Sequence, residues 1–297
     1  MNAPTSSTRA GLVVVDKPAA MTSHDVVARV RRLAGTRKVG HAGTLDPMAT
    51  GVLLLGVNRA TRLLGHLMLT EKAYDATIRL GASTNTDDAD GEIVTHASAA
   101  GLDEDDVRTA AARFVGDIEQ VPSSVSAIKV DGERAYKRVR AGEILDLPPR
   151  PVTVHELAVH DLRREGDLLD VDVSVRCSSG TYIRAIARDL GAELGVGGHL
   201  RSLRRTAVGD FGLDEAWPLG EMETTGDVHL VGLDAVAARC FPGHHVDEAG
   251  ARDVSFGRSL EVRLPGDEPV AVFGPGDRFL ALYQQKGDLA APVAVFV

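Results

Sequence analysis

The stretch GHAGTLDPMATG, residues 40–51, holds a single carboxylate, Asp46, in a loop with three glycines and a proline directly after the acid. A residue before proline is biased to extended backbone, and glycines allow another molecule to approach the chain closely. Two interpretations of this local pattern stay open. Asp46 either caps a helix that begins at Pro47, or it is a chemically active carboxylate held in a fixed place.

The composition is that of a folded protein with a sizeable core. The chain has 297 residues, 44% of them apolar, which predicts one large domain and a small one. No stretch approaches the roughly 18 consecutive apolar residues of a membrane span, and the first ten residues lack the apolar centre of a signal peptide. We therefore expect a cytoplasmic protein without a membrane partner. Cys177 and Cys240 lie far apart, which predicts two reduced interior thiols.

The formal net charge of -9 conceals two basic stretches. Residues 22–72 carry eight Lys or Arg against three Asp or Glu, and residues 176–205 carry six Arg against two acids. For a polyanionic partner, the distribution of charge matters more than its sum. These stretches are either solvated helix faces or a basic groove for the phosphates of a nucleic acid.

Hydrophobic periodicity assigns most of the chain to strands and helices. The segment at residues 72–81 alternates in polarity, which predicts a strand with Tyr74 on its apolar face. The apolar stretch at residues 51–68 fits neither a strand nor a helix alone. Further strands are predicted at residues 11–18, 152–165 and 167–180, and helices at residues 22–35, 103–115 and 181–194. From about Cys240 onward, short strands broken by Gly and Pro predict a small separate β domain.

Several familiar motifs fail on inspection. Residues 35–42 have the glycine spacing of a phosphate loop without its Lys and hydroxyl. His155 and His160 are five apart on a predicted strand, so they cannot share a helical face toward zinc. The acidic segment TDDADGE, residues 86–92, lacks the first and twelfth ligands of a calcium loop, and residues 244–245, both His, fall in a predicted exposed loop. We therefore expect a site that uses neither a metal nor a cofactor.

Five segments, taken together, resemble one known family. They read GLVVVDKPAAMTSHDVV, GHAGTLDPMATGVLLLGVNRATRL, KAYDATIRLGASTNTDDADGE, the segment at residues 120–142, and CSSGTYIRAIARDLG. In this order, over residues 11–211, they resemble the bacterial TruB family, the tRNA pseudouridine-55 synthases. One departure is visible: Ser123, Ser124 and Val125 stand where family members tend to have prolines and an aromatic residue.

The resemblance implies a fold and a division of the chain. The fold is α+β, the pseudouridine synthase fold, in which helices flank a central, mostly antiparallel sheet. We expect a flexible tail at residues 1–10, a catalytic domain at residues 11–236, and a domain similar to the small β-barrel called PUA, which binds RNA, at residues 237–297. We also expect a monomer.

The resemblance further implies an isomerase whose essential group is Asp46. This carboxylate acts on the ribose of a uridine, either as a nucleophile or as the base that starts an elimination. Arg184, in GTYIR, matches an arginine partner that keeps the aspartate ionised. Tyr74 matches a tyrosine that stacks on the target base. From the pattern alone, Arg184 could equally be a surface cation and Tyr74 a core residue.

Other positions match the family's pocket and RNA contacts. Tyr182 and Leu203 match pocket residues, with Leu203 packing on the uracil, and Lys17 matches a lysine near the floor of the site. The implied partner is the T-arm of tRNA, whose target base must be flipped out of its stack. His41 matches a histidine that braces the disturbed loop, although a loop histidine facing water fits the pattern as well.

Two functions of other classes remain open. The chain could be a tRNA-binding or tRNA-folding factor with incidental catalysis. It could also be a carbohydrate-active hydrolase, because glycoside cleavage takes place at an anomeric carbon too. A hydrolase would need a second carboxylate near Asp46, and no other acid stands in a comparably constrained motif.

Overall fold

The computed structural model of the chain describes residues 9–123, 129–130, 133–134 and 147–297. Residues 1–8 of the predicted N-terminal tail lie outside the described residues. So does most of the segment at residues 120–142, including Ser124 and Val125 of the departure from the family pattern.

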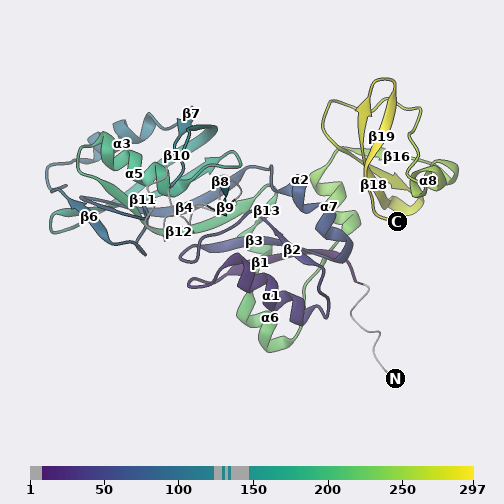
Figure 1. The fold of residues 1–297 in the computed structure, drawn as a ribbon, viewed down its shortest axis with the longest axis horizontal. Coiled ribbons are helices and arrows are strands. Elements are labelled where there is room, and N and C mark those ends of the chain that lie inside the picture. Colours follow the sequence, from purple (N-terminus) through teal and green to yellow (C-terminus); the bar gives the residue numbers. More distant parts are fainter. Residues whose placement is uncertain (1–8, 124–128, 131–132, 135–146) are drawn as a thin grey trace.

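Within the described residues, eleven strands form one large sheet, which is the centre of the fold (Figure 1). Its strands in spatial order are β14 (Trp217–Pro218), β1 (Gly11–Lys17), β3 (Thr50–Val57), β12 (Gly198–Val208), β4 (Lys72–Leu80), β11 (Leu168–Cys177), β10 (Arg150–Glu165) and β7 (Gly116–Gln120), with β2 (Val39–Ala42), β13 (Phe211–Gly212) and β15 (Val231–Gly232) paired alongside. Neighbours in the sheet are antiparallel except for β1 with β14 and β3 with β12. The predicted central, mostly antiparallel sheet is therefore confirmed.

The two middle strands explain why the sheet can carry a site. β4 pairs with β12 along one edge and with β11 along the other, so both of its edges are covered. Its side chains alternate as predicted, and Tyr74 on the apolar face is only 7% exposed. β3 meets β12 for only two residue pairs, Arg204 with Thr50 and Arg205 with Gly51. The loop at residues 43–49 therefore leaves the sheet next to its middle strands.

Helices flank the sheet in two groups (Figure 1). α1 (Ser23–Leu33) and α6 (Leu219–Thr225) lie at the β1 end, whereas α3 (Glu104–Ala112) and α5 (Ile183–Glu193) lie over the half that holds β10 and β12. Thr22 caps α1 in a reciprocal capping box with Asp25, and the buried valines of α1 have helical spacing. The helices predicted at residues 22–35, 103–115 and 181–194 are confirmed.

The stretch that the sequence left ambiguous combines several elements. After β3 the chain forms the 3-10 helix η2 (Asn58–Arg62) and the short helix α2 (Leu64–Leu67) before it enters β4. Its glycines and short helical turns explain why no single periodicity fits. The remaining short elements are β5 (Ala82–Thr84), β6 (Ile93–His96), β8 (Lys129–Val130), β9 (Glu133–Arg134) and η3 (Leu213–Glu215).

The C-terminal part forms a separate small sheet, as predicted (Figure 1). Its four strands are β16 (Gly243–His245), β17 (Val270–Gly274), β18 (Arg278–Lys286) and β19 (Leu289–Val295), accompanied by α8 (Glu248–Ser255) and η4 (Pro275–Asp277), and α7 (Leu233–Cys240) precedes them. Phe273, Phe279 and Phe296 share an apolar cluster with Leu12 and Val14 of β1, so this sheet packs against the β1 end of the large sheet.

Two smaller predictions need correction. Residues 244–245 lie in β16 and not in a loop, because their backbone pairs with β17 and His245 stacks on Phe273. Cys177 is buried as expected, but Cys240 at the end of α7 is only partly buried. Among the described residues, no helix has the length and apolar character needed to cross a membrane.

Gly51 offers a test of how closely β3 and β12 approach. Its φ is +96°, and an added Cβ would lie 2.2 Å from the carbonyl oxygen of Arg205. We predict that Gly51→Ala lowers the free energy of unfolding by about 2 kcal/mol or more, because backbone strain and a backbone clash combine. Gly65→Ala is the matched control, since nothing lies within 4 Å of its added Cβ. Urea unfolding checks both, and equal stability of the two variants would contradict the prediction.

Candidate active site

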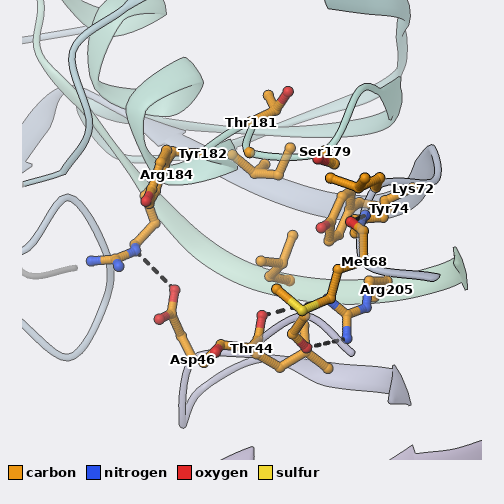
Figure 2. A pocket seen from close by; sticks show the side chains of 16 residues that line it. Thr44, Asp46, Met68, Lys72, Tyr74, Ser179, Thr181, Tyr182, Arg184 and Arg205 are labelled. Atoms are coloured by element: carbon orange, nitrogen blue, oxygen red, sulfur yellow. Dashed lines mark hydrogen bonds and ion pairs between the residues drawn. The ribbon is translucent and has the colours of Figure 1, made fainter. Parts of the chain in front are cut away.

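A pocket of about 360 Å³ opens where the loop after β2 faces the start of α5 (Figure 2). It brings together four segments that are distant in the sequence. The lining residues are Gly43, Thr44, Leu45, Asp46, Met68, Leu69, Lys72, Tyr74, Ser179, Gly180, Thr181, Tyr182, Ile183, Arg184, Leu203 and Arg205. Five predicted site residues are among them: Asp46, Tyr74, Tyr182, Arg184 and Leu203.

Asp46 and Arg184 form the central ion pair of this pocket (Figure 2). Nε of Arg184 lies 3.0 Å from Oδ2 of Asp46, and the Arg184 side chain is only 4% exposed while that of Asp46 is 37% exposed. Arg184 is therefore not a surface cation. Asp46 does not cap a helix either, because residues 46–49 form a turn that leads into β3. The carboxylate thus faces the pocket with one fixed cation beside it.

Asp88 is a second, buried partner of Arg184 that the sequence analysis missed. Its Oδ2 lies 3.3 Å from Nη1 of Arg184, and the same nitrogen donates to the carbonyl of Thr86 at 2.9 Å. Burial raises the pKa of Asp88, while the Thr86 hydroxyl and Arg184 act against that rise. The signals in the sequence were its place in the segment at residues 72–92 that resembles the family and in an acidic stretch that failed as a calcium loop.

An aromatic and aliphatic wall faces the ion pair. Tyr74 and Leu203 are 7% and 8% exposed and lie on the neighbouring strands β4 and β12. Burial raises the pKa of the Tyr74 hydroxyl, against the influence of the nearby Arg205 guanidinium. Tyr182 directly precedes α5, and the Gln120 amide fixes its backbone by donating to its carbonyl at 3.0 Å and accepting from its N–H at 2.8 Å.

Arg205 fixes the loop that carries Asp46 and was not singled out from the sequence. It is 1% exposed, and its guanidinium donates to the carbonyls of Val52 at 2.7 Å and Gly43 at 3.1 Å, and to that of Thr44 at 3.4 Å. Two of these carbonyls belong to the residues that lead into Asp46. Its position two residues after Leu203, on the same face of β12, is the signal that could have found it.

Lys17 supports the same loop from beneath, as the sequence suggested. It is fully buried, and its ammonium donates to the carbonyls of Pro18 at 2.8 Å, Met21 at 2.6 Å and Pro47 at 3.2 Å. Burial lowers its pKa to about 8, although the charge of Asp46 acts in the opposite direction. Lys17 does not line the pocket but fixes the residue after Asp46.

His41 lies in β2, outside the residues that line the pocket. Its ring meets that of His24 edge to face, with centroids 5.4 Å apart. The position is next to the catalytic loop but not in the cavity. No group of three or more His, Cys, Asp or Glu within the described part of the chain is arranged to hold a metal ion.

Comparison with known proteins adds the family. The model of the TruB family pseudouridylate synthase (N terminal domain) matches residues 31–183, and that of the tRNA pseudouridylate synthase B C-terminal domain matches residues 184–228. A third, described as tRNA Pseudouridine synthase II, C terminal, matches residues 241–297. The chain belongs to the TruB family. It is therefore a pseudouridine synthase, an isomerase, and the resemblance drawn from its sequence motifs is confirmed.

Relatives named tRNA pseudouridine synthase B align with nearly the whole length of this chain. The tRNA pseudouridine synthase B of Corynebacterium efficiens is 55% identical over 296 residues, 99% of this chain and 98% of its own length. That of Rhodococcus jostii is 56% identical over 288 residues, 96% and 93% of the two chains. The chain is also similar to a chain in a solved Cbf5-Nop10-Gar1 complex, with a TM-score of 0.73 and 25% sequence identity. The match covers 97% of this chain and 85% of the chain in that complex. The pseudouridine synthase fold is thereby confirmed.

The role of Asp88 can be tested without touching the pocket lining. We predict that Asp88→Asn lowers kcat by about 100-fold, because Arg184 loses a charged partner and shifts from Asp46, and small misplacements at a reacting centre are costly. RNA affinity should change little, as Asp88 does not line the pocket. Pseudouridine formation is measured at saturating RNA, with the exposed Asp90→Asn as control. Equal rates for the two variants would contradict the prediction.

Lys17 yields a prediction about pH and stability. Its pKa of about 8 in the folded protein lies below the ordinary 10.5, so between these values the unfolded chain retains a proton that the folded protein has released. The free energy of unfolding should therefore rise with pH between about 8 and 10.5 through this group. Unfolding of the native protein and of Lys17→Met is compared at each pH. The native protein should gain stability relative to the variant as pH rises; a gap that stays constant would refute the assignment.

Proposed function

We propose that this protein isomerises uridine 55 in the T-loop of tRNA to pseudouridine, with Asp46 as its catalytic residue. The observation that carries the proposal is a half-exposed carboxylate, ion-paired to the buried Arg184, that faces a pocket walled by Tyr74 and Leu203. Relatives more than half identical over nearly their full length are named tRNA pseudouridine synthase B. The substrate tRNA is inferred for this chain from those names.

The reaction exchanges one bond for another without a net change of atoms. The bond from ribose C1' to uracil N1 breaks, the uracil turns within the site, and a bond forms from C1' to C5. The proton on C5 is then lost, and N1 is protonated. Because no electrons are transferred to an external acceptor and no water is consumed, the chemistry requires no cofactor.

Asp46 suits either of two first steps. As a nucleophile its carboxylate attacks C1' and releases uracil. As a base it removes a ribose proton and starts an elimination. Both use a carboxylate oxygen of Asp46, and the Arg184 guanidinium at 3.0 Å holds that carboxylate in place. The loop is fixed from beneath by Arg205 and Lys17, so the carboxylate meets the ribose at a defined position.

Tyr74 and Leu203 are suited to hold the uracil while it is detached. The aromatic ring and the aliphatic side chain lie on adjacent strands and form an apolar wall. Because burial raises the pKa of the Tyr74 hydroxyl, the phenol remains protonated at neutral pH. We therefore assign Tyr74 to stacking on the base, with Tyr182 completing the pocket beside Arg184.

Cations without a carboxylate partner among the described residues indicate where the RNA backbone lies, although Arg59 and Arg62 also donate to the carbonyls of Phe296 and Val295. Many arginines of the basic stretches are committed, for example Arg29 to Glu223 and Arg176 to Glu71. A hollow of about 690 Å³ next to β2 is lined by Arg37, Lys38, Arg59 and Arg62. We propose that it contacts phosphates next to the flipped nucleotide and that His41, on the same strand, braces the vacated loop.

The remaining parts of the proposal concern the setting of the enzyme. We assign residues 11–236 to catalysis and residues 237–297 to a PUA-like RNA-binding domain, and we propose a monomer that works in the cytoplasm. A carbohydrate-active hydrolase is not supported, because Asp46 is the one carboxylate among the described lining residues and Asp88 lies behind Arg184.

Tritium release tests the activity and the catalytic residue together. A T-arm RNA labelled at C5 of the target uridine is incubated with the native protein and with Asp46→Asn at equal RNA occupancy. We predict release by the native protein and a loss of at least about 10⁴-fold in the variant, because no other group on the pocket wall can replace the carboxylate. RNA binding by the variant should persist.

The outcomes separate the two functional classes. RNA bound tightly by the native protein with no tritium released would exclude the synthase and favour a tRNA-binding or tRNA-folding factor. Release by both proteins would remove Asp46 from the mechanism.

A further inference from the structure

The mouth of the pocket has a rim that the proposed mechanism does not use. It is the turn between α2 and β4, residues 68–70, which we call the lip. Met68 and Leu69 line the same pocket as Asp46, yet they are 46% and 75% exposed, whereas Leu203 on the inner wall is 8% exposed. Figure 2 shows Met68 on the side of the pocket that holds Tyr74 and Arg205. Two large apolar side chains are thus exposed to solvent at the entrance of the pocket.

The backbone of the lip is fixed although its side chains are exposed. The ammonium of Lys72 donates to the carbonyls of Met68 at 2.9 Å and Thr70 at 2.6 Å. The Thr70 hydroxyl donates to the carbonyl of Leu67 at 2.8 Å, and the carbonyl of Glu71 accepts from the N–H of Gly209 at 2.8 Å. These bonds hold the turn at both of its ends.

Lys72 holds this turn although burial removes its ammonium group from water. It is 7% exposed, and burial lowers its pKa to about 8. Burying an ammonium among carbonyls costs free energy that a simple connection between a helix and a strand does not need. A need for a fixed lip position, so that the lip can contact the molecule that enters the pocket, accounts for this burial.

We propose that Met68 and Leu69 pack against the ring and ribose of the flipped target nucleotide, and that Lys72 is the positioning residue that holds them there. The inference rests on the proposed function. A base that leaves its stack loses its apolar neighbours, and apolar side chains at the pocket mouth replace them. With Tyr74 and Leu203 on the inner wall, the lip closes the outer side and keeps water from the ribose on which Asp46 acts.

Photocrosslinking tests the contact directly. A T-arm hairpin with 4-thiouridine at the target position is bound to the full chain carrying Asp46→Asn, so that no turnover occurs, and is irradiated. We expect peptide mapping to place cross-links at residues 68–70. Cross-links confined to the inner-wall peptides that contain Tyr74 and Leu203 would overturn the proposal.

Kinetics test whether the contact contributes to the reaction. The double variant Met68→Ala, Leu69→Ala should lower kcat/KM by about tenfold or more, because two apolar side chains no longer pack on the nucleotide in the transition state. Its affinity for the same hairpin with an abasic target should fall less than its kcat/KM, because the contact with the uracil ring is absent there and only the contact with the ribose remains. Val115→Ala is the control, because Val115 is 44% exposed and does not line the pocket.

The result also distinguishes this inference from the proposed function. If the native protein makes no pseudouridine, the proposed function itself is refuted. A native protein that is active, with a double variant of equal kcat/KM, would refute the lip alone.

The positioning role of Lys72 is tested by non-additivity. Lys72→Met should lower kcat/KM by about as much as the double variant, and Lys72→Arg should recover part of that loss. Introduced into the double variant, Lys72→Met should cause little further loss, because the side chains that it positions are gone. Full additivity of the losses, with all variants folded by thermal unfolding, would show that Lys72 acts elsewhere.

Discussion

The ion pair between Asp46 and Arg184 is the constraint on which the site depends. Arg184 is almost fully buried, so its charge must be matched by carboxylates and carbonyls. Asp46 faces it from the pocket and Asp88 from the interior. A buried pair of this kind is weak evidence for stability, because desolvation offsets much of the attraction. Its consequence is orientation: the Asp46 carboxylate is held in one position facing the pocket.

The sheet makes this arrangement possible. Asp46 follows β2, Arg184 begins α5, and the wall comes from β4 and β12, so the site joins segments that lie far apart along the chain. The buried cations Arg205 and Lys17 then fix the backbone on both sides of Asp46 through carbonyls rather than carboxylates. Because carbonyls carry no net charge, these cations position the loop without competing with Arg184 for the catalytic carboxylate.

The sequence predicted the parts of the structure that local patterns encode. Alternation placed Tyr74 on the buried face of β4, and helical spacing of apolar residues located α1. It failed where tertiary contacts decide. Glycines and short turns interrupt the segment that forms β3, η2 and α2, so no single periodicity predicted these elements. Residues 244–245 form a strand because they pair with β17, a contact that the local sequence does not encode.

The same distinction separates the site residues that were found from those that were missed. Asp46, Tyr74, Tyr182 and Arg184 belong to motifs that resemble a family, Leu203 lies within the span of that resemblance, and the structure brings all five to one pocket. Asp88 and Lys72 lie in the matching segment at residues 72–92, but nothing in it marked them as site residues, and Arg205 lies outside the quoted segments. Each works through groups distant in sequence or through backbone carbonyls, which residue identity does not reveal. In this protein, the motifs identified pocket residues that we propose face the substrate, while burial of charge identified the groups that hold them in place.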